Sequence, residues 1–185
     1  MANRIYNYSA FYVKEPFNEC ALGAHATHDF VYYNMLRAWK GKDASFPFLD
    51  AHETTYDVRD NSVWETLQNR LRSRLRNSKN IILFLSSDTV VSRAFNEEMS
   101  YGMGELGLPV IVVYPEYDSN SLIANENKPN WRAEELWDRL PAFRDRMDDV
   151  PTAHVPLNRE YITKALEDKD FTIQHKHTNF CWCYS

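Results

Sequence analysis

Two short apolar runs without any polar interruption limit the folds open to this chain more than any other feature. They are residues 81–85, with the sequence IILFL, and residues 109–114, with the sequence PVIVVY. Neither run alternates between apolar and polar residues, so both faces of each segment are expected to be covered, which is typical of central strands in a parallel sheet.

The segment that connects the two runs, residues 91–106, has the periodicity of a helix. Its apolar positions recur at a spacing of about 3.6 residues and form one stripe. They are Val91, Phe95, Met99, Gly102, Met103 and Leu106. A strand, a helix and a second strand in this order indicate a right-handed βαβ crossover.

Two neighbouring carboxylates in this predicted helix differ in their position relative to the stripe. Glu97 points away from the stripe and is expected on the surface, whereas Glu98 lies on its shoulder. At the shoulder, Glu98 is either partly buried or faces a cleft at the sheet edge, unless it turns outwards to solvent or pairs with Arg93. Burial of an unpaired charge is costly, and perturbed carboxylates often mark functional sites, so both interpretations stay open here.

Along the whole chain, strands and helices are expected to alternate. The strands are predicted at residues 4–11, 46–50, 80–86, 109–114 and 152–157. The helices are predicted at residues 29–40, 62–77 and 91–106, from 131 with an interruption at Pro141, and after 158. This alternation predicts a doubly wound α/β domain with a flavodoxin-like, five-stranded parallel sheet. We expect the domain at residues 1–168 and a short C-terminal extension at residues 169–185.

Polar residues and one glycine mark the expected ends of these helices. The predicted caps are Asp29, Ser62, Asn130 and Asn158 at helix starts and Gly41 after the first helix. Pro47 indicates that the second strand lies at a sheet edge, because proline lacks the N–H that a central strand needs. The polar segment at residues 117–130 is expected to be a loop.

Composition and charge exclude several classes of function. The formal net charge of −5 argues against a general binder of nucleic acid or of anionic membranes. The arginines at positions 70, 72, 74 and 76 are therefore expected to cover a solvated helix surface. No apolar run approaches the roughly 18 residues of a membrane span. The N-terminus lacks the apolar core of a secretory signal, and three cysteines do not suggest a disulfide framework, so we expect a cytoplasmic protein.

Ligands of doubly wound sheets bind beyond the carboxyl ends of the strands, near the point where the strand order reverses. The side chains expected at this rim are those of Ser9, Phe11, Tyr12, Asp50, His52, Ser86, Ser87 and Tyr114. Glu98 is expected to approach the same rim from its helix.

Several of these rim residues have two interpretations. Asp50 and His52 form an acid–base pair or cap a loop. Phe11 and Tyr12 stack on a ring of the ligand, or they are core or oligomer contacts. Residues 86–89, with the sequence SSDT, are expected to cap the following helix, because the partners of a serine nucleophile cannot be placed.

The C-terminal segment contains four side chains of the kinds that bind zinc, at His175, His177, Cys181 and Cys183. Their spacing matches no strong zinc pattern, and the alternation also suits a terminal strand. We therefore expect no metal site and a structural or disordered tail. No G-x-G-x-x-G fingerprint is present, which disfavours hydride transfer with NAD in a Rossmann site.

Five segments together resemble the TIR-like domain family, and most closely the TIR subunit of the bacterial Thoeris anti-phage systems. They are residues 49–53 (LDAHE), 74–79 (RLRNSK), 81–85 (IILFL), 92–98 (SRAFNEE) and 107–111 (GLPVI). The resemblance spans about residues 1–168 and implies a TIR-like fold.

Enzymatic members of that family cleave NAD between nicotinamide and ribose, with a glutamate in the helix after the third strand, usually in a W-x-x-x-E pattern. By position this glutamate is Glu98, while the tryptophan position is Ala94, next to Phe95. The resemblance implies an NAD glycohydrolase or ADP-ribosyl cyclase that uses NAD as substrate and no other cofactor. Its product would be a cyclic ADP-ribose-type messenger for a separate effector protein.

A second interpretation is a non-catalytic TIR-like adaptor that acts by association with other proteins, including copies of itself. The absence of tryptophan at Ala94 and the abundance of tyrosine fit this interpretation. Release of nicotinamide from NAD distinguishes the enzyme from the adaptor.

Overall fold

A computed structural model describes residues 8–11, 28–50, 64–89, 93–124, 128–175 and 181–184. In this part of the chain five strands form one sheet in the order β1-β2-β3-β4-β5, and all neighbouring pairs are parallel. The strands are β1 (Tyr8–Phe11), β2 (Ser78–Phe84), β3 (Val110–Tyr114), β4 (Thr152–Pro156) and β5 (Cys181–Cys183). The predicted parallel α/β architecture is confirmed.

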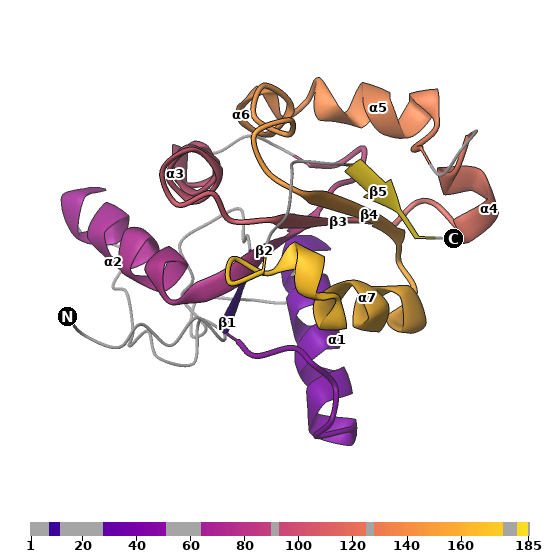
Figure 1. The fold of residues 1–185 in the computed structure, drawn as a ribbon, viewed down its shortest axis with the longest axis horizontal. Coiled ribbons are helices and arrows are strands. Elements are labelled where there is room, and N and C mark those ends of the chain that lie inside the picture. The colour runs from indigo at the N-terminus through magenta and orange to yellow at the C-terminus, as the bar shows by residue number, and fades with distance from the viewer. Residues whose placement is uncertain are drawn as a thin grey trace.

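Helices cover both faces of this sheet (Figure 1). One face carries α1 (His28–Lys42) and α7 (Arg159–Glu167), followed by the 3₁₀ turn η2 (Lys169–Phe171). The other face carries α2 (Trp64–Arg76), α3 (Arg93–Met99), the π-helix η1 (Ser100–Glu105), α5 (Trp131–Trp137) and α6 (Pro141–Arg144). The short helix α4 (Ser119–Leu122) lies between β3 and α5.

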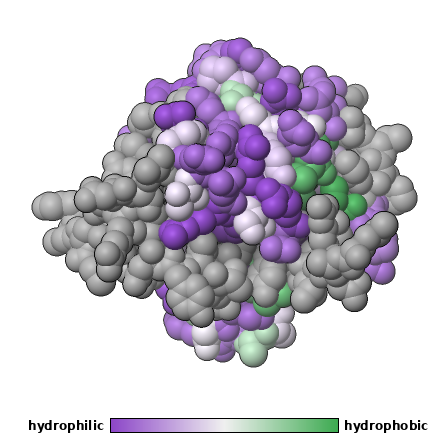
Figure 2. All heavy atoms as spheres, turned by 90° about the vertical axis from the view of Figure 1, so that its left-hand side faces the viewer, coloured by the Kyte–Doolittle hydropathy of each residue, from purple (hydrophilic) through white to green (hydrophobic). Residues whose placement is uncertain are grey.

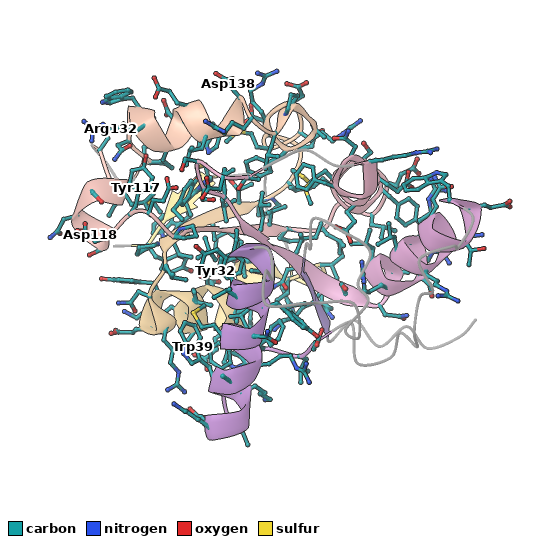
Figure 3. All side chains as sticks on the ribbon, turned by 180° about the vertical axis from the view of Figure 1, so that it is seen from behind. Tyr32, Trp39, Tyr117, Asp118, Arg132 and Asp138 are labelled. Atoms are coloured by element: carbon teal, nitrogen blue, oxygen red, sulfur yellow. The ribbon has the colours of Figure 1, made fainter. Side chains whose placement is uncertain are left out.

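The unbroken apolar runs serve two hydrophobic cores at once. Ile81 and Leu83 pack with the helices of the α3 face, while Ile82 and Phe84 pack with those of the α1 face. On the α1 face, the ring of Tyr32 stacks on Phe84 with centroids 4.8 Å apart (Figure 3). Successive strand residues point to opposite faces, so nearly every side chain of a strand covered on both sides is buried and most are apolar.

The predicted strand at residues 46–50 is wrong in extent. Only Asp50 bridges to Ser9, and the Leu49 carbonyl accepts a hydrogen bond of 2.9 Å from the Ser9 N–H. Pro47 has no N–H to donate, which limits pairing along this segment. The bridge lies on the side of β1 that faces away from β2, so the strand order reverses at β1, as in doubly wound sheets.

The fifth strand of the sheet comes instead from the segment that we predicted as an extension. β5 pairs with β4, with Thr152 opposite Cys181 and His154 opposite Cys183. The part of the predicted first strand before Tyr8 lies outside the described residues.

The predicted ends of the first helix are also wrong. Asp29 lies within α1, and the helix continues through Gly41 to Lys42. The Asp43 N–H donates to the Trp39 carbonyl at 3.0 Å, and the Lys40 ammonium donates to the carbonyls of Ala44 and Phe46 at 2.7 Å each. The first bond satisfies a carbonyl in the last turn of α1, and the Lys40 bonds hold the segment that follows the helix.

The helix predicted at residues 91–106 changes its hydrogen-bond pattern after Met99. The Leu106 N–H donates to the Tyr101 carbonyl at 3.0 Å, which is the i to i−5 bond of a π-helix. Gly102 lies in this wider segment, where an added Cβ would lie 2.7 Å from Ile81 Cδ1. Gly107, with φ of 62°, follows the segment. Residues 91 and 92 lie outside the described residues.

The later helix caps are confirmed. The Asn130 side chain accepts from the Ala133 N–H at 3.0 Å, and the Asn158 side chain accepts from the Glu160 N–H at 2.8 Å. The expected loop at 117–130 contains α4, which begins with a capping box at Asp118. Figure 3 labels Asp118 beside Tyr117 and near Arg132 of α5. The predicted cap Ser62 lies outside the described residues.

Candidate active site around Glu98

Glu98 is buried between helices α2 and α3. Its neighbours Phe95 and Met99 are both fully buried in the core of the α3 face, and Glu98 itself is 4% exposed. Oε1 of Glu98 accepts a hydrogen bond of 2.6 Å from Nη2 of Arg74, a residue of α2. The alternative in which Glu98 turns outwards to Arg93 is wrong, because the Arg93 guanidinium stacks over the Trp64 ring at 3.9 Å.

The surroundings of Glu98 bring the protonated and the ionised form of its carboxyl group close in free energy near neutral pH. Burial raises the pKa of Glu98 to about 7, against the opposing effect of the positive charge and hydrogen bond of Arg74. Desolvation disfavours the charged form of a carboxyl group, and a nearby guanidinium favours it. A carboxyl group held between these influences is a candidate for chemistry near neutral pH.

Glu97 also has partners on α2, so its predicted surface position is wrong. It accepts from Gln68 Nε2 at 2.9 Å and from Arg72 Nε at 2.6 Å, and its side chain is 15% exposed. The cause is the packing of α2 beside α3, which supplies cations to both neighbouring carboxylates.

The arginines of α2 do not form the solvated surface that we predicted. Arg72 and Arg74 pair with the two glutamates, and Arg76 Nε donates to the Tyr101 hydroxyl at 2.8 Å. The Arg72 guanidinium also lies 4.7 Å from the centre of the Tyr101 ring. These side chains join α2 to α3 and η1. Charged residues remain buried when they are paired in this way.

Ser9 and Asp50 lie on the opposite face of the sheet from Glu98. Asp50, Ser9 and Asn80 are neighbours across the sheet and point to the same side. The Asp50 carboxylate accepts from the Tyr33 hydroxyl of α1, and Asn80 Nδ2 donates to the Phe171 carbonyl at 3.1 Å. Side-chain alternation along the strands therefore separates this polar row from Glu98, which the sequence analysis had placed at the same rim.

The other predicted rim residues are described only in part. Phe11 is the last residue of β1, and Tyr12 and His52 lie outside the described residues. Ser87 is exposed, and its N–H and hydroxyl both donate to Glu116. Ser86 closes a turn, since its carbonyl accepts from the Thr89 N–H at 3.1 Å. Among the described residues of this set, none places a second reactive group beside Glu98.

Comparison with known protein families identifies the chain. Residues 8–120 match the family described as Thoeris protein ThsB, TIR-like domain. The chain belongs to this family. The match includes both Arg74 and Glu98, and it assigns the ThsB-type chain to anti-phage defence signalling together with a separate effector. In the described part of the chain, no helix is both long and apolar enough to cross a membrane.

The α3 face also holds a buried polar network that joins Tyr114, expected at the rim, to Trp137 and His154, two residues that lie beyond the family match. The hydroxyl of Tyr114 lies 2.8 Å from His154 Nδ1 and accepts from Trp137 Nε1 at 2.8 Å. Burial lowers the pKa of His154 to about 3 and raises that of Tyr114. Both groups are therefore neutral at physiological pH, and the network joins α5 to β3 and β4. The sequence feature that indicates this network is the presence of polar residues within otherwise apolar strands.

The candidate zinc ligands near the C-terminus do not meet at one point in the described part of this ThsB-type chain. His177 lies outside the described residues. Cys181 is exposed and Cys183 is buried, and both belong to β5. Among the residues that the structure describes, no group of three or more His, Cys, Asp or Glu side chains is arranged to hold a metal ion.

Proposed function

We propose that this ThsB-type chain cleaves NAD between nicotinamide and ribose and that Glu98 is the catalytic residue. The observation that supports the proposal is the burial of the Glu98 carboxylate beside Arg74 in the family-matched part of the chain. The substrate is NAD, without a further cofactor, and the reaction takes place in the cytoplasm. The class of enzyme is NAD glycohydrolase or ADP-ribosyl cyclase.

The chemistry of this bond explains the need for a fixed carboxylate. Departure of nicotinamide builds positive charge on the ribose, as in the oxocarbenium-like transition state of glycosidases. A preorganised carboxylate stabilises this charge, and nicotinamide leaves as a neutral molecule without a strong acid. Oε1 of Glu98 accepts the hydrogen bond from Arg74, and Oε2 has no hydrogen-bond partner among the described residues. Oε2 is the atom that would face the ribose.

The acceptor that follows nicotinamide decides the product. Water would give ADP-ribose, whereas a nucleophile within the same molecule would give a cyclic ADP-ribose-type nucleotide. We favour the cyclic product as a messenger, because the family acts together with a separate effector. Exclusion of water from the site would favour cyclisation over hydrolysis.

The proposal is tested by chromatography of NAD after incubation with protein purified from phage-infected cells. Nicotinamide and a nucleotide product should appear together, and a protein-free filtrate should activate the partner effector in a second tube. If intact protein activates the effector and the filtrate does not, the chain acts as an adaptor through protein contacts, and the messenger proposal fails.

A further inference from the structure

Two arginines on one side of α2 have buried N–H groups without a hydrogen-bond partner. They are Nη1 of Arg70 and Nε of Arg74. Residues four apart on a helix are neighbours on its surface, with Cβ atoms roughly 6 Å apart. Buried donors in folded proteins nearly always have partners, so two such groups on adjacent turns require an explanation.

Arg70 differs from the other arginines of α2 in its partners. Arg72 pairs with Glu97 and Arg74 pairs with Glu98, while Arg76 donates to the Tyr101 hydroxyl. Arg70 has no carboxylate partner in the part of the chain that the structure describes. Within the described residues Arg70 is therefore a cation without an anion, which suits it to bind an external one.

We propose that Arg70 and Arg74 bind the diphosphate of the dinucleotide substrate, next to Glu98. The inference rests on the proposed cleavage of NAD. Guanidinium groups bind phosphate oxygens through paired N–H donors, which suits two arginines whose free N–H groups lie on adjacent turns. Arg74 would then contact the catalytic carboxylate through Nη2 and the phosphate through Nε.

The structure of NAD would bring an anion close to Glu98 in the proposed reaction. In NAD the diphosphate is attached to C5′ of the same ribose whose C1′–nitrogen bond breaks. A ribose held at Glu98 therefore brings its phosphate within the length of one sugar from the carboxylate. Arg74 touches Glu98 at 2.6 Å, and Arg70 lies one turn before Arg74 along α2. Figure 2 views the side of the molecule on which α2 lies in Figure 1, and the described residues at its centre are hydrophilic.

The test uses inorganic pyrophosphate as the probe, with the full chain and calorimetric titration. Arg70→Gln should weaken pyrophosphate binding by about tenfold, because it removes one charged donor pair. Arg70→Lys should retain part of the affinity, since it keeps the charge. Arg76→Gln is the matched control: it changes an arginine of the same helix that donates to Tyr101, and it should bind pyrophosphate like the unsubstituted protein.

A second measurement compares NAD with nicotinamide riboside, which lacks the diphosphate. Arg70→Gln should raise KM for NAD by about tenfold, leave kcat within about twofold and leave the turnover of nicotinamide riboside unchanged. Equal pyrophosphate affinity in Arg70→Gln and the unsubstituted protein, or no binding by either, overturns the anion site. Pyrophosphate binding that depends on Arg70 without any release of nicotinamide supports the site and instead defeats the proposed cleavage.

Discussion

Arg74 Nη2 lies 2.6 Å from Glu98 Oε1, and the two side chains are only 11% and 5% exposed. The contact joins the last turns of α2 to α3. It follows that the charge of Glu98 depends on where α2 lies, because Arg74 is the cation that opposes the effect of burial on the carboxyl pKa.

Replacement of Glu98 by glutamine should abolish NAD cleavage while the fold persists. The change removes the charge and keeps the shape, and loss of one preorganised electrostatic group lowers kcat by about 10²–10³. Glu97→Gln is the matched control, since Glu97 also pairs with an arginine of α2 but lies further from the core. Nicotinamide release is the measurement, and equal rates for the two variants would contradict the role of Glu98.

The stability of the protein should depend on the ionisation of Glu98. Its pKa rises from 4.5 to about 7 on folding, so the folded state holds the proton more tightly than the unfolded state. This tighter proton binding adds fully to the free energy of unfolding below pH 4.5. As pH rises towards 7, roughly 3 kcal/mol of that free energy is lost. Glu98→Gln should lack this loss in urea unfolding at pH 5 and pH 7.5. A parallel decline in both proteins would show that another group is responsible.

His154 should produce the opposite dependence at acid pH. Its pKa falls from 6.5 to about 3 on folding, so the unfolded state binds the proton first. The free energy of unfolding does not depend on His154 above pH 6.5. Below that pH it falls by about 1.4 kcal/mol for each unit of pH, until about pH 3. His154→Gln keeps a polar group beside Tyr114. It should reduce the pH dependence of the free energy of unfolding measured between pH 4 and pH 7. An unchanged slope would mean that His154 is protonated in the folded state.

Gly102→Ala should destabilise the fold by about 1–3 kcal/mol, because the new methyl group would overlap a packed core side chain. The Cβ would lie 2.7 Å from Ile81 Cδ1. Gly41→Ala is the control, since a Cβ there meets nothing within 4 Å, and alanine should be neutral or stabilise α1 by up to about 1 kcal/mol. Thermal unfolding compares the two variants, and the explanation by close packing fails if Gly102→Ala is as stable as Gly41→Ala.

The sequence predicted those features that depend on local periodicity. The runs at residues 81–85 and 109–114 became central strands, and the stripe in the following helix correctly placed Phe95 and Met99 in the core. The strand at residues 46–50 failed because pairing at a sheet edge depends on neighbours distant in sequence. Periodicity did not predict the π-helical bonding after Met99, in the segment where Gly102 lies close to Ile81 of β2.

The site was predicted less completely than the fold. Periodicity placed Glu98 on the shoulder of the stripe, but its partner Arg74 lies 24 residues earlier in the chain. Only the packing of α2 against α3 brings the two together. Ser9 and Asp50 were assigned to the same rim because strand ends meet there, but the face to which each side chain points depends on register.

The π-helix η1 also determines where this chain tolerates a change in length. A π-helical segment holds one residue more than an α-helix that connects the same two points. Deletion of one residue from a regular α-helix turns every later side chain by about 100°. Deletion of one residue within Ser100–Glu105 would instead restore α-helical bonding, leaving Glu98 and β3 in their present orientations. This segment is therefore the place between α3 and β3 where a single-residue deletion disturbs the register least.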